Sequence, residues 1–202
     1  MRKLFLLYAV FACGCSSLPF FDSSVGPKSQ YSLEQATLLS PNEPSWYLMQ
    51  NEIHSLVFSK KFTDKAQSTV ISAAMYPAGA HKTSRAFLEF VADQRVKQDD
   101  KARFKVLSVN NEYVTFKELP CLKYQSLSED HKDKGISSSD FEYFQTSGYI
   151  CRYPLEYIAF QFEISHRSKE KEIPANLLKI AQDFFQNIRL VEPTIKRLKT
   201  IP

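Results

Sequence analysis

The sequence predicts an α+β fold, with a mostly antiparallel sheet packed by two helices in a single domain that follows an N-terminal signal and a tether. The 16 Phe and 10 Tyr of the chain favour strands, because aromatic side chains suit a pleated, half-buried surface. Several short stretches are apolar or alternate with polar residues, whereas two longer ones repeat apolar residues at helical spacing. A chain of 202 residues suffices for one sizeable core, and we expect that domain at residues 43–190.

The first strands are expected at residues 46–50 and 53–59, joined by a tight turn at Asn51-Glu52. A longer strand at residues 69–76 ends before Pro77. Residues 83–98 are predicted to form the first helix, because apolar residues recur there at helical spacing with charged residues between them. The apolar positions are Ala86, Phe87, Phe90 and Val91.

After this helix the pattern again predicts strands, with a hairpin turn at Asn110-Asn111. The expected strands are 104–109, 113–119, 121–125, 141–146, 149–153 and 157–166, and residues 127–140 are expected to form a polar loop. Residues 157–166 alternate most cleanly, which indicates an antiparallel strand with one face on the core. Glu163 falls on the polar side of this strand and is expected to be exposed. A second helix is predicted at residues 174–189, where Pro174 suits the first turn.

Two cysteines beyond the N-terminal region, Cys121 and Cys151, each lie in a predicted strand. If these strands pair antiparallel, the two residues can lie opposite each other and form a disulfide. Closing a loop of about 30 residues would stabilise the fold by roughly 3.5 kcal/mol in the chain-entropy model. A pair of cysteines without neighbouring ligands does not favour a zinc site.

The N-terminus has the layout of a secretory signal peptide. Arg2 and Lys3 precede an apolar stretch at residues 4–12, which is too short to span a bilayer. Small residues and cysteines follow, at Ala12-Cys13-Gly14-Cys15. Ordinary cleavage after Gly14 would also fit this pattern and would release a secreted protein with an unmodified Cys15.

The segment that ends at Cys15 resembles the lipobox of bacterial lipoproteins, in which a small residue precedes a cysteine that receives a diacylglycerol. This resemblance implies a signal peptide at residues 1–14 and acylation of Cys15, with Cys13 as the alternative. Residues 15–42 would then be the acylated cysteine and a flexible tether, with docking of residues 31–39 on the edge of the domain as a weaker alternative. Ser16 after the lipidated cysteine favours the outer membrane over the inner one in enterobacterial-type sorting, with the domain facing the periplasm. Residues 191–202 are expected to form a loose basic tail.

No catalytic or metal-binding residues are assigned, and no cofactor is expected. The five glycines are widely spaced, which excludes a dinucleotide fingerprint or a phosphate-cradling loop, and no Gly-x-Ser-x-Gly motif occurs. The four histidines are scattered, and Glu129-Asp130 is placed in the polar loop. The formal net charge of +4 falls to about +2 without Arg2 and Lys3 of the signal. So small a charge indicates neither nucleic acid nor strong electrostatic membrane binding, and no nucleic-acid partner is expected.

The order of elements and the segment 184–188, with Phe184, Phe185 and Ile188 on the last helix, resemble the PsbP/Mog1/DcrB-like α+β fold. This resemblance covers residues 45–190 and implies a fold but no functional residue. Trp46, Phe58 and Phe160 could line a ligand groove, or they could belong to the core.

The resulting hypothesis is a non-enzymatic lipoprotein of the cell envelope. It would be held to the membrane by acyl chains and would act as an accessory, binding or assembly factor for other envelope proteins. The alternatives are a carrier of a small or lipid-like ligand in an apolar cavity, and a hydrolase of a new kind. A filled core with exposed apolar surface would favour the first hypothesis, and an apolar cavity would favour the carrier.

Overall fold

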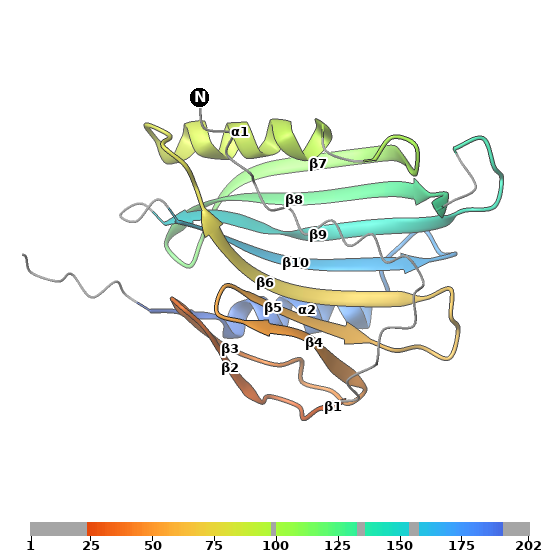
Figure 1. The fold of residues 1–202 in the computed structure, drawn as a ribbon, viewed down its shortest axis with the longest axis horizontal. Helices are drawn as coiled ribbons and strands as arrows, with labels where there is room; N and C mark the ends of the chain where they lie inside the picture. Colours follow the sequence, from red (N-terminus) through yellow and green to blue (C-terminus); the bar gives the residue numbers. More distant parts are fainter. Residues whose placement is uncertain (1–23, 98–99, 133–135, 154–157, 192–202) are drawn as a thin grey trace, which may run out of the picture.

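The structure is a computed structural model that describes residues 24–97, 100–132, 136–153 and 158–191. Its main element is an eight-stranded antiparallel sheet in the order β1-β4-β5-β6-β10-β9-β8-β7 (Figure 1). The bounds are β1 Ser24–Val25, β4 Trp46–Glu52, β5 Ser55–Lys60, β6 Ser68–Pro77, β7 Phe104–Phe116, β8 Leu119–Asp130, β9 Glu142–Tyr153 and β10 Ile158–Ser168. The predicted α+β class is confirmed.

Two helices and a small second sheet cover the two faces of the large sheet. The helices are α1 (Ser84–Lys97) and α2 (Ala175–Asn187), and the second sheet has the order β11-β3-β2. Its strands are β2 Gln30–Leu33, β3 Ala36–Leu39 and β11 Arg189–Leu190. Helix α1 runs along the β7–β8 end of the sheet, whereas α2 lies behind its middle strands (Figure 1).

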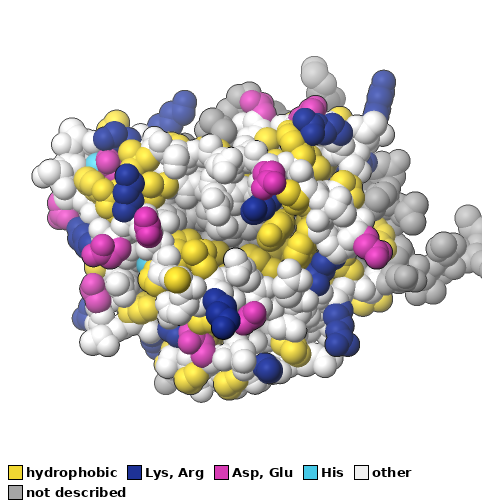
Figure 2. All heavy atoms as spheres, turned by 180° about the vertical axis from the view of Figure 1, so that it is seen from behind, with side chains coloured by type: hydrophobic (Ala, Val, Ile, Leu, Met, Phe, Trp, Pro, Cys, Tyr) yellow, Lys and Arg dark blue, Asp and Glu magenta, His cyan; other side chains and the backbone are white. Residues whose placement is uncertain are grey.

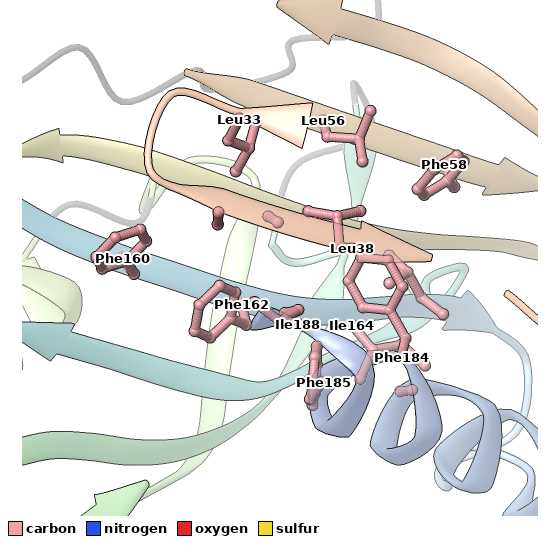
Figure 3. Close-up of a cluster of buried hydrophobic side chains, with 14 of the residues drawn as sticks. Leu33, Leu38, Leu56, Phe58, Phe160, Phe162, Ile164, Phe184, Phe185 and Ile188 are labelled. Carbon is pink, nitrogen blue, oxygen red and sulfur yellow. The ribbon is translucent and has the colours of Figure 1, made fainter. Parts of the chain in front are cut away.

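The core is divided by the sheet because successive side chains of a strand point to opposite faces. On β10, Phe160, Phe162 and Ile164 pack toward α2 and the small sheet, whereas Ala159 packs toward α1. Phe184 and Phe185 of α2 close over the first set, and Leu38 of β3 joins them (Figure 3). Residues 157–166 were predicted to have one face on the core and one face in solvent. Instead, side chains on both faces of this strand lie in a core.

Residues 24–39 fold onto the domain, although a tether was predicted over 15–42. Strand β3 pairs with β2 along one edge and with β11 along the other. Strand β11 follows directly after helix α2. Ala36 and Leu38 are buried in the core. A tether was favoured because apolar positions in this stretch are few, whereas docking of residues 31–39 was the weaker alternative. Pairing of β3 with both β2 and β11 gives these residues a three-stranded sheet.

The turn predicted at Asn110-Asn111 is wrong, because β7 runs without interruption through these residues. They pair with Gln125 and Tyr124 of β8, and the hairpin turn lies at Lys117-Glu118 instead. Both turn residues have positive φ, 51° and 64°, as a two-residue type I′ hairpin requires. Asparagine tolerates such φ values better than lysine or glutamate, so composition pointed to the wrong place. The predicted loop at 127–140 is likewise shortened, since β8 continues to Asp130.

A buried histidine on the α2 side predicts a pH dependence of stability. His166 shares a 2.7 Å hydrogen bond with the Thr69 hydroxyl and packs against Phe62. Burial lowers the pKa of His166 below its ordinary value, so the folded state disfavours its protonated form. The stability that the neutral ring provides should be present above a pH of about 6.5 and lost progressively below it.

Urea titrations at a series of pH values check this expectation. His166→Gln should flatten the fall in the free energy of unfolding below a pH of about 6.5. His54→Gln is the matched control, because the His54 side chain is 57% exposed in the β4–β5 turn. If His54→Gln flattened the profile as much as His166→Gln, the pH dependence would not originate at the buried ring.

Candidate interaction surface

The predicted disulfide between Cys121 and Cys151 is present in the structure. The two residues lie directly opposite each other on β8 and β9, with their Cα atoms 4.0 Å apart. Both are 0% exposed and belong to the core on the α2 side. The cross-link thus joins β8 and β9, the second and third strands counted from the β7 edge. Helix α1 packs on the other face of the same two strands.

Trp46, Phe58 and Phe160, considered for a ligand groove, are all 0% exposed and form part of the packed core. Phe58 contacts Phe184 edge to face, with ring centroids 6.0 Å apart. The hollow at the β7–β8 hairpin and the one beside His131 are lined by other side chains. The structure therefore places them as core residues, the other reading that the sequence allowed.

A polar network lies between α1 and the sheet. Arg95 of α1 stacks on Tyr124, with its guanidinium carbon 3.5 Å from the ring centroid, and approaches Glu163 at 3.7 Å. The Tyr124 hydroxyl donates a 2.7 Å hydrogen bond to Glu163. Burial, followed by the charge of Glu163, raises the pKa of Tyr124 well above its ordinary value. Glu163 is therefore not the exposed residue that the alternation predicts, because α1 covers that face.

Gly148 makes room for this network. A Cβ built there would lie 2.0 Å from the Phe162 carbonyl oxygen and 2.9 Å from the Tyr124 hydroxyl. Real side chains do not approach backbone so closely, so any substitution would push β9 away from β10. The glycine thus serves close approach of strands rather than a turn.

A second charged cluster surrounds Asp130, at the end of β8. Arg103 binds its carboxylate through two hydrogen bonds of 2.8 and 2.9 Å, and Arg167 adds an ion pair of 2.7 Å. Burial raises the pKa of Asp130, but the hydrogen bond from Arg103 and the charge of Arg167 outweigh it, and the pKa is lowered. The sequence placed Asp130 in a solvated loop, whereas its side chain is 0% exposed. These contacts tie β8 to the residue before β7 and to β10.

A shallow hollow lies where the first turn of α1 meets the β7–β8 hairpin. Its volume is about 260 Å³. Arg85 and Leu88 line it from the helix, and Tyr113, Thr115 and Pro120 line it from the hairpin. The Arg85 guanidinium lies 3.5 Å from the centroid of the Tyr113 ring, which places a charge and an aromatic face together at the surface. Such a mixed, open hollow suits contact with another macromolecule better than enclosure of a small ligand.

Hydrophobic side chains are also exposed along β7. Val106, Leu107, Val109 and Tyr113 are each about 40% exposed, at 41%, 39%, 39% and 39%. Figure 2 shows yellow hydrophobic areas around a hollow on one face of the molecule, with acidic and basic side chains scattered among them. Single exposed apolar residues are ordinary, whereas several on one edge strand mark a candidate contact surface.

Other predicted features find no site in the described residues. His54, His81, His131 and His166 are separated, and no group of three or more His, Cys, Asp or Glu in the described parts is placed to hold a metal. No helix in these parts is long and apolar enough to cross a membrane. Cys15, Cys13, the signal at 1–14 and residues 192–202 of the basic tail lie outside the described residues.

The comparisons with known proteins bear on the fold. No protein-family profile and no curated protein sequence matches the chain. A point mutant of the protein Mog1 is similar in structure, with a TM-score of 0.52 at 10% identity, over 82% of this chain and 96% of that one. This likeness supports the resemblance to the PsbP/Mog1/DcrB-like fold and, at such low identity, shows the fold alone.

Two further structures are similar at TM-scores below 0.5. The Ran-binding protein Mog1p of Saccharomyces cerevisiae has a TM-score of 0.48 at 11% identity, over 83% of this chain and 97% of that one. LpqN of Mycobacterium tuberculosis, involved in cell envelope biogenesis, has 0.49 at 12%, over 84% and 90%.

Proposed function

We propose that this protein is a lipid-anchored component of the bacterial cell envelope that acts without catalysis, as an accessory, binding or assembly factor for other envelope proteins. Cys15, or alternatively Cys13, would carry the acyl chains after removal of residues 1–14. The domain would face the periplasm, with the outer membrane favoured. The lipobox-like sequence supports the anchor, and the buried disulfide suits an oxidising compartment.

One observation carries the binding role: the core is filled, while apolar and aromatic side chains are exposed at the β7 end of the sheet. The aromatic residues proposed for a groove are fully buried, whereas Tyr113 stands beside Arg85 in an open hollow. Tyrosine and arginine are enriched at the centres of protein interfaces. Neither the hollow at the β7–β8 hairpin nor the one beside His131 is lined by Trp46, Phe58 or Phe160, the residues considered for a carrier's groove.

The anchor is tested by acylation of a single-cysteine variant. In the full chain, Cys15→Ala should abolish incorporation of labelled palmitate and release the protein from membranes. Cys13→Ala is the matched control and should leave labelling intact. The reverse result would move the anchor to Cys13, and labelling of the double variant would contradict acylation at either position.

The binding surface is tested by filling the hollow. Thr115→Arg places a long cationic side chain beside Arg85 without touching the core, because Thr115 is exposed. In affinity purification from detergent-solubilised envelopes, this variant should recover at least about tenfold less of any specific partner than the wild type. Ile53→Ser is the matched control, since Ile53 is 62% exposed in the distant β4–β5 turn. Equal loss in both variants, or no specific partner of the wild type, would contradict the proposal.

A further inference from the structure

Strand β7 forms one edge of the large sheet and pairs with β8 alone in the described structure. It spans 13 residues, from Phe104 to Phe116, whereas the opposite edge is the two-residue β1. A long edge strand presents a row of backbone N–H and C=O groups that can pair with another strand. Most of its side chains are exposed along its length, so a second strand could approach.

The two faces of β7 differ in chemistry. Toward the α1 side point Phe104, Val106, Val109, Asn111 and Tyr113, which pair with β8 residues on that face. Toward the other side point Lys105, Ser108, Asn110 and Glu112. A bulge between Val106 and Ser108 sets Leu107 aside and restores this alternation. Between Phe104 and Tyr113 the first face is thus mostly apolar, whereas the second face is polar and carries Lys105 and Glu112. Nearer the hairpin, the second face carries Val114 and Phe116, which pack against the core on the α2 side.

We propose that β7 pairs antiparallel with β7 of a second copy of this chain, about a twofold axis at Val109, so that the two large sheets become one. In this register Lys105 lies opposite Glu112 of the second copy, and Glu112 lies opposite its Lys105. On the apolar face Val109 meets its own copy, and Phe104 lies opposite Tyr113. Each residue meets one that points to the same face, as antiparallel pairing requires.

Charge complementarity selects this register. Within one chain Lys105 already pairs with Glu129 at 3.1 Å, and Glu112 with Lys123 at 3.1 Å. Across the proposed interface these charges form a row that alternates in sign, from Glu129 to Lys105 and on to Glu112 and Lys123 of the second copy. Opposite charges facing each other across strands stabilise pairing, and like charges oppose it. Moving the register by two residues, the smallest shift that keeps the faces matched, puts Lys105 opposite Asn110 or Val114 instead.

The bulge is compatible with this arrangement. A bulge in an edge strand often discourages pairing because it interrupts the ladder. Here the twofold axis places the two copies of Leu107 symmetrically on either side of Val109. Both strands therefore lose the same residue from the ladder, and the faces stay matched from Lys105 to Glu112.

The charge row is tested by sedimentation of the full chain in detergent at micromolar concentrations. After the bound detergent is subtracted, the wild-type particle should have the mass of two processed chains. Glu112→Lys should weaken the dimer at least about tenfold, because it opposes Lys105 with a second lysine. The double exchange, Lys105→Glu with Glu112→Lys, re-forms the opposite-charge pair across the interface and should recover part of the association, although each new charge then lies beside a like charge of its own chain. Circular dichroism should show that all three proteins are folded. A wild type that stays at the mass of one chain would overturn the proposal, as would a single variant that dimerises like the wild type.

A cysteine placed on the axis tests the register itself. In a chain with Cys13→Ala and Cys15→Ala, Val109→Cys should give a disulfide-linked dimer on mild oxidation, since antiparallel partners directly opposite each other can be bridged. Thr115→Cys is the matched control, on the same strand and also exposed but far from the axis. Equal cross-linking of both variants, or none at Val109→Cys, would contradict the register. The two proposals share Tyr113, but their readouts differ: Thr115→Arg is scored by partner recovery, whereas Glu112→Lys and Val109→Cys are scored by self-association.

Discussion

Removing the cross-link between Cys121 and Cys151 should lower the free energy of unfolding by about 3.5 kcal/mol. The disulfide closes a loop with a sequence separation of 30 residues, and that loop contains most of β8 and β9 together with their connection. Without the bond the unfolded chain gains the conformational freedom of this loop. Urea denaturation of the double variant Cys121→Ala, Cys151→Ala measures the loss.

The control for this variant is the reduced wild type, which keeps both sulfur atoms in the core. Both cysteines are 0% exposed, so truncation to alanine also removes packing, whereas reduction removes the bond alone. The difference between the two proteins separates these effects. If the reduced wild type unfolded at the same urea concentration as the oxidised one, the disulfide would contribute nothing to stability.

Asp130→Asn should destabilise the domain by about 3 kcal/mol. The substitution keeps the shape of the side chain but removes the charge that both Arg103 and Arg167 contact. Both guanidinium groups would then lose their shared counter-ion in a partly buried site. Each arginine side chain keeps about a fifth of its surface exposed, 22% and 23%, so the expected loss lies at the low end for buried pairs.

The same carboxylate predicts an acid limit to stability. Its pKa is lowered in the folded state from an ordinary value of 3.8, so its contribution is complete above that value and is lost as the pH falls through the folded pKa. Asp130→Asn should remove this acid-dependent step from the stability profile. Asp140→Asn is the matched control, because Asp140 is 58% exposed beside Lys169, and it should change stability by less than about 0.5 kcal/mol. A comparable loss in both variants would contradict the role of the buried cluster.

The elements that were predicted well share strong local periodicity. Strand β10 and helix α2 bury side chains at regular intervals, every second residue on β10 and at three- to four-residue spacing on α2. Their residue types therefore carried the pattern before any partner was known. The disulfide was also predictable, because each cysteine lay in a strand and the loop between them allowed antiparallel pairing.

The candidate site was predicted poorly because the sequence pattern of polar residues on a strand is the same whether water or a helix covers that face. Glu163 alternates with buried neighbours, and nothing local signals that Arg95 of α1 will lie over it. The sequence neighbours of Asp130 are polar. Its side chain is buried by contacts with Arg103 and Arg167, which belong to other segments of the chain. The hollow at Tyr113 likewise needs α1 and the β7–β8 hairpin in place.

Local pattern was enough to predict the α+β class and the cysteine pair, which the structure confirms. The secretory signal of the N-terminus and its lipid anchor stay predictions. These follow from short-range regularities that a single segment expresses by itself. The length of β7, the folding of residues 24–39 onto the domain and the buried charges were decided by contacts between segments far apart in the chain. Asn110-Asn111 had suitable turn residues, yet pairing with β8 carried the strand past them, because ladder hydrogen bonds and cross-strand packing outweigh a weak local turn preference.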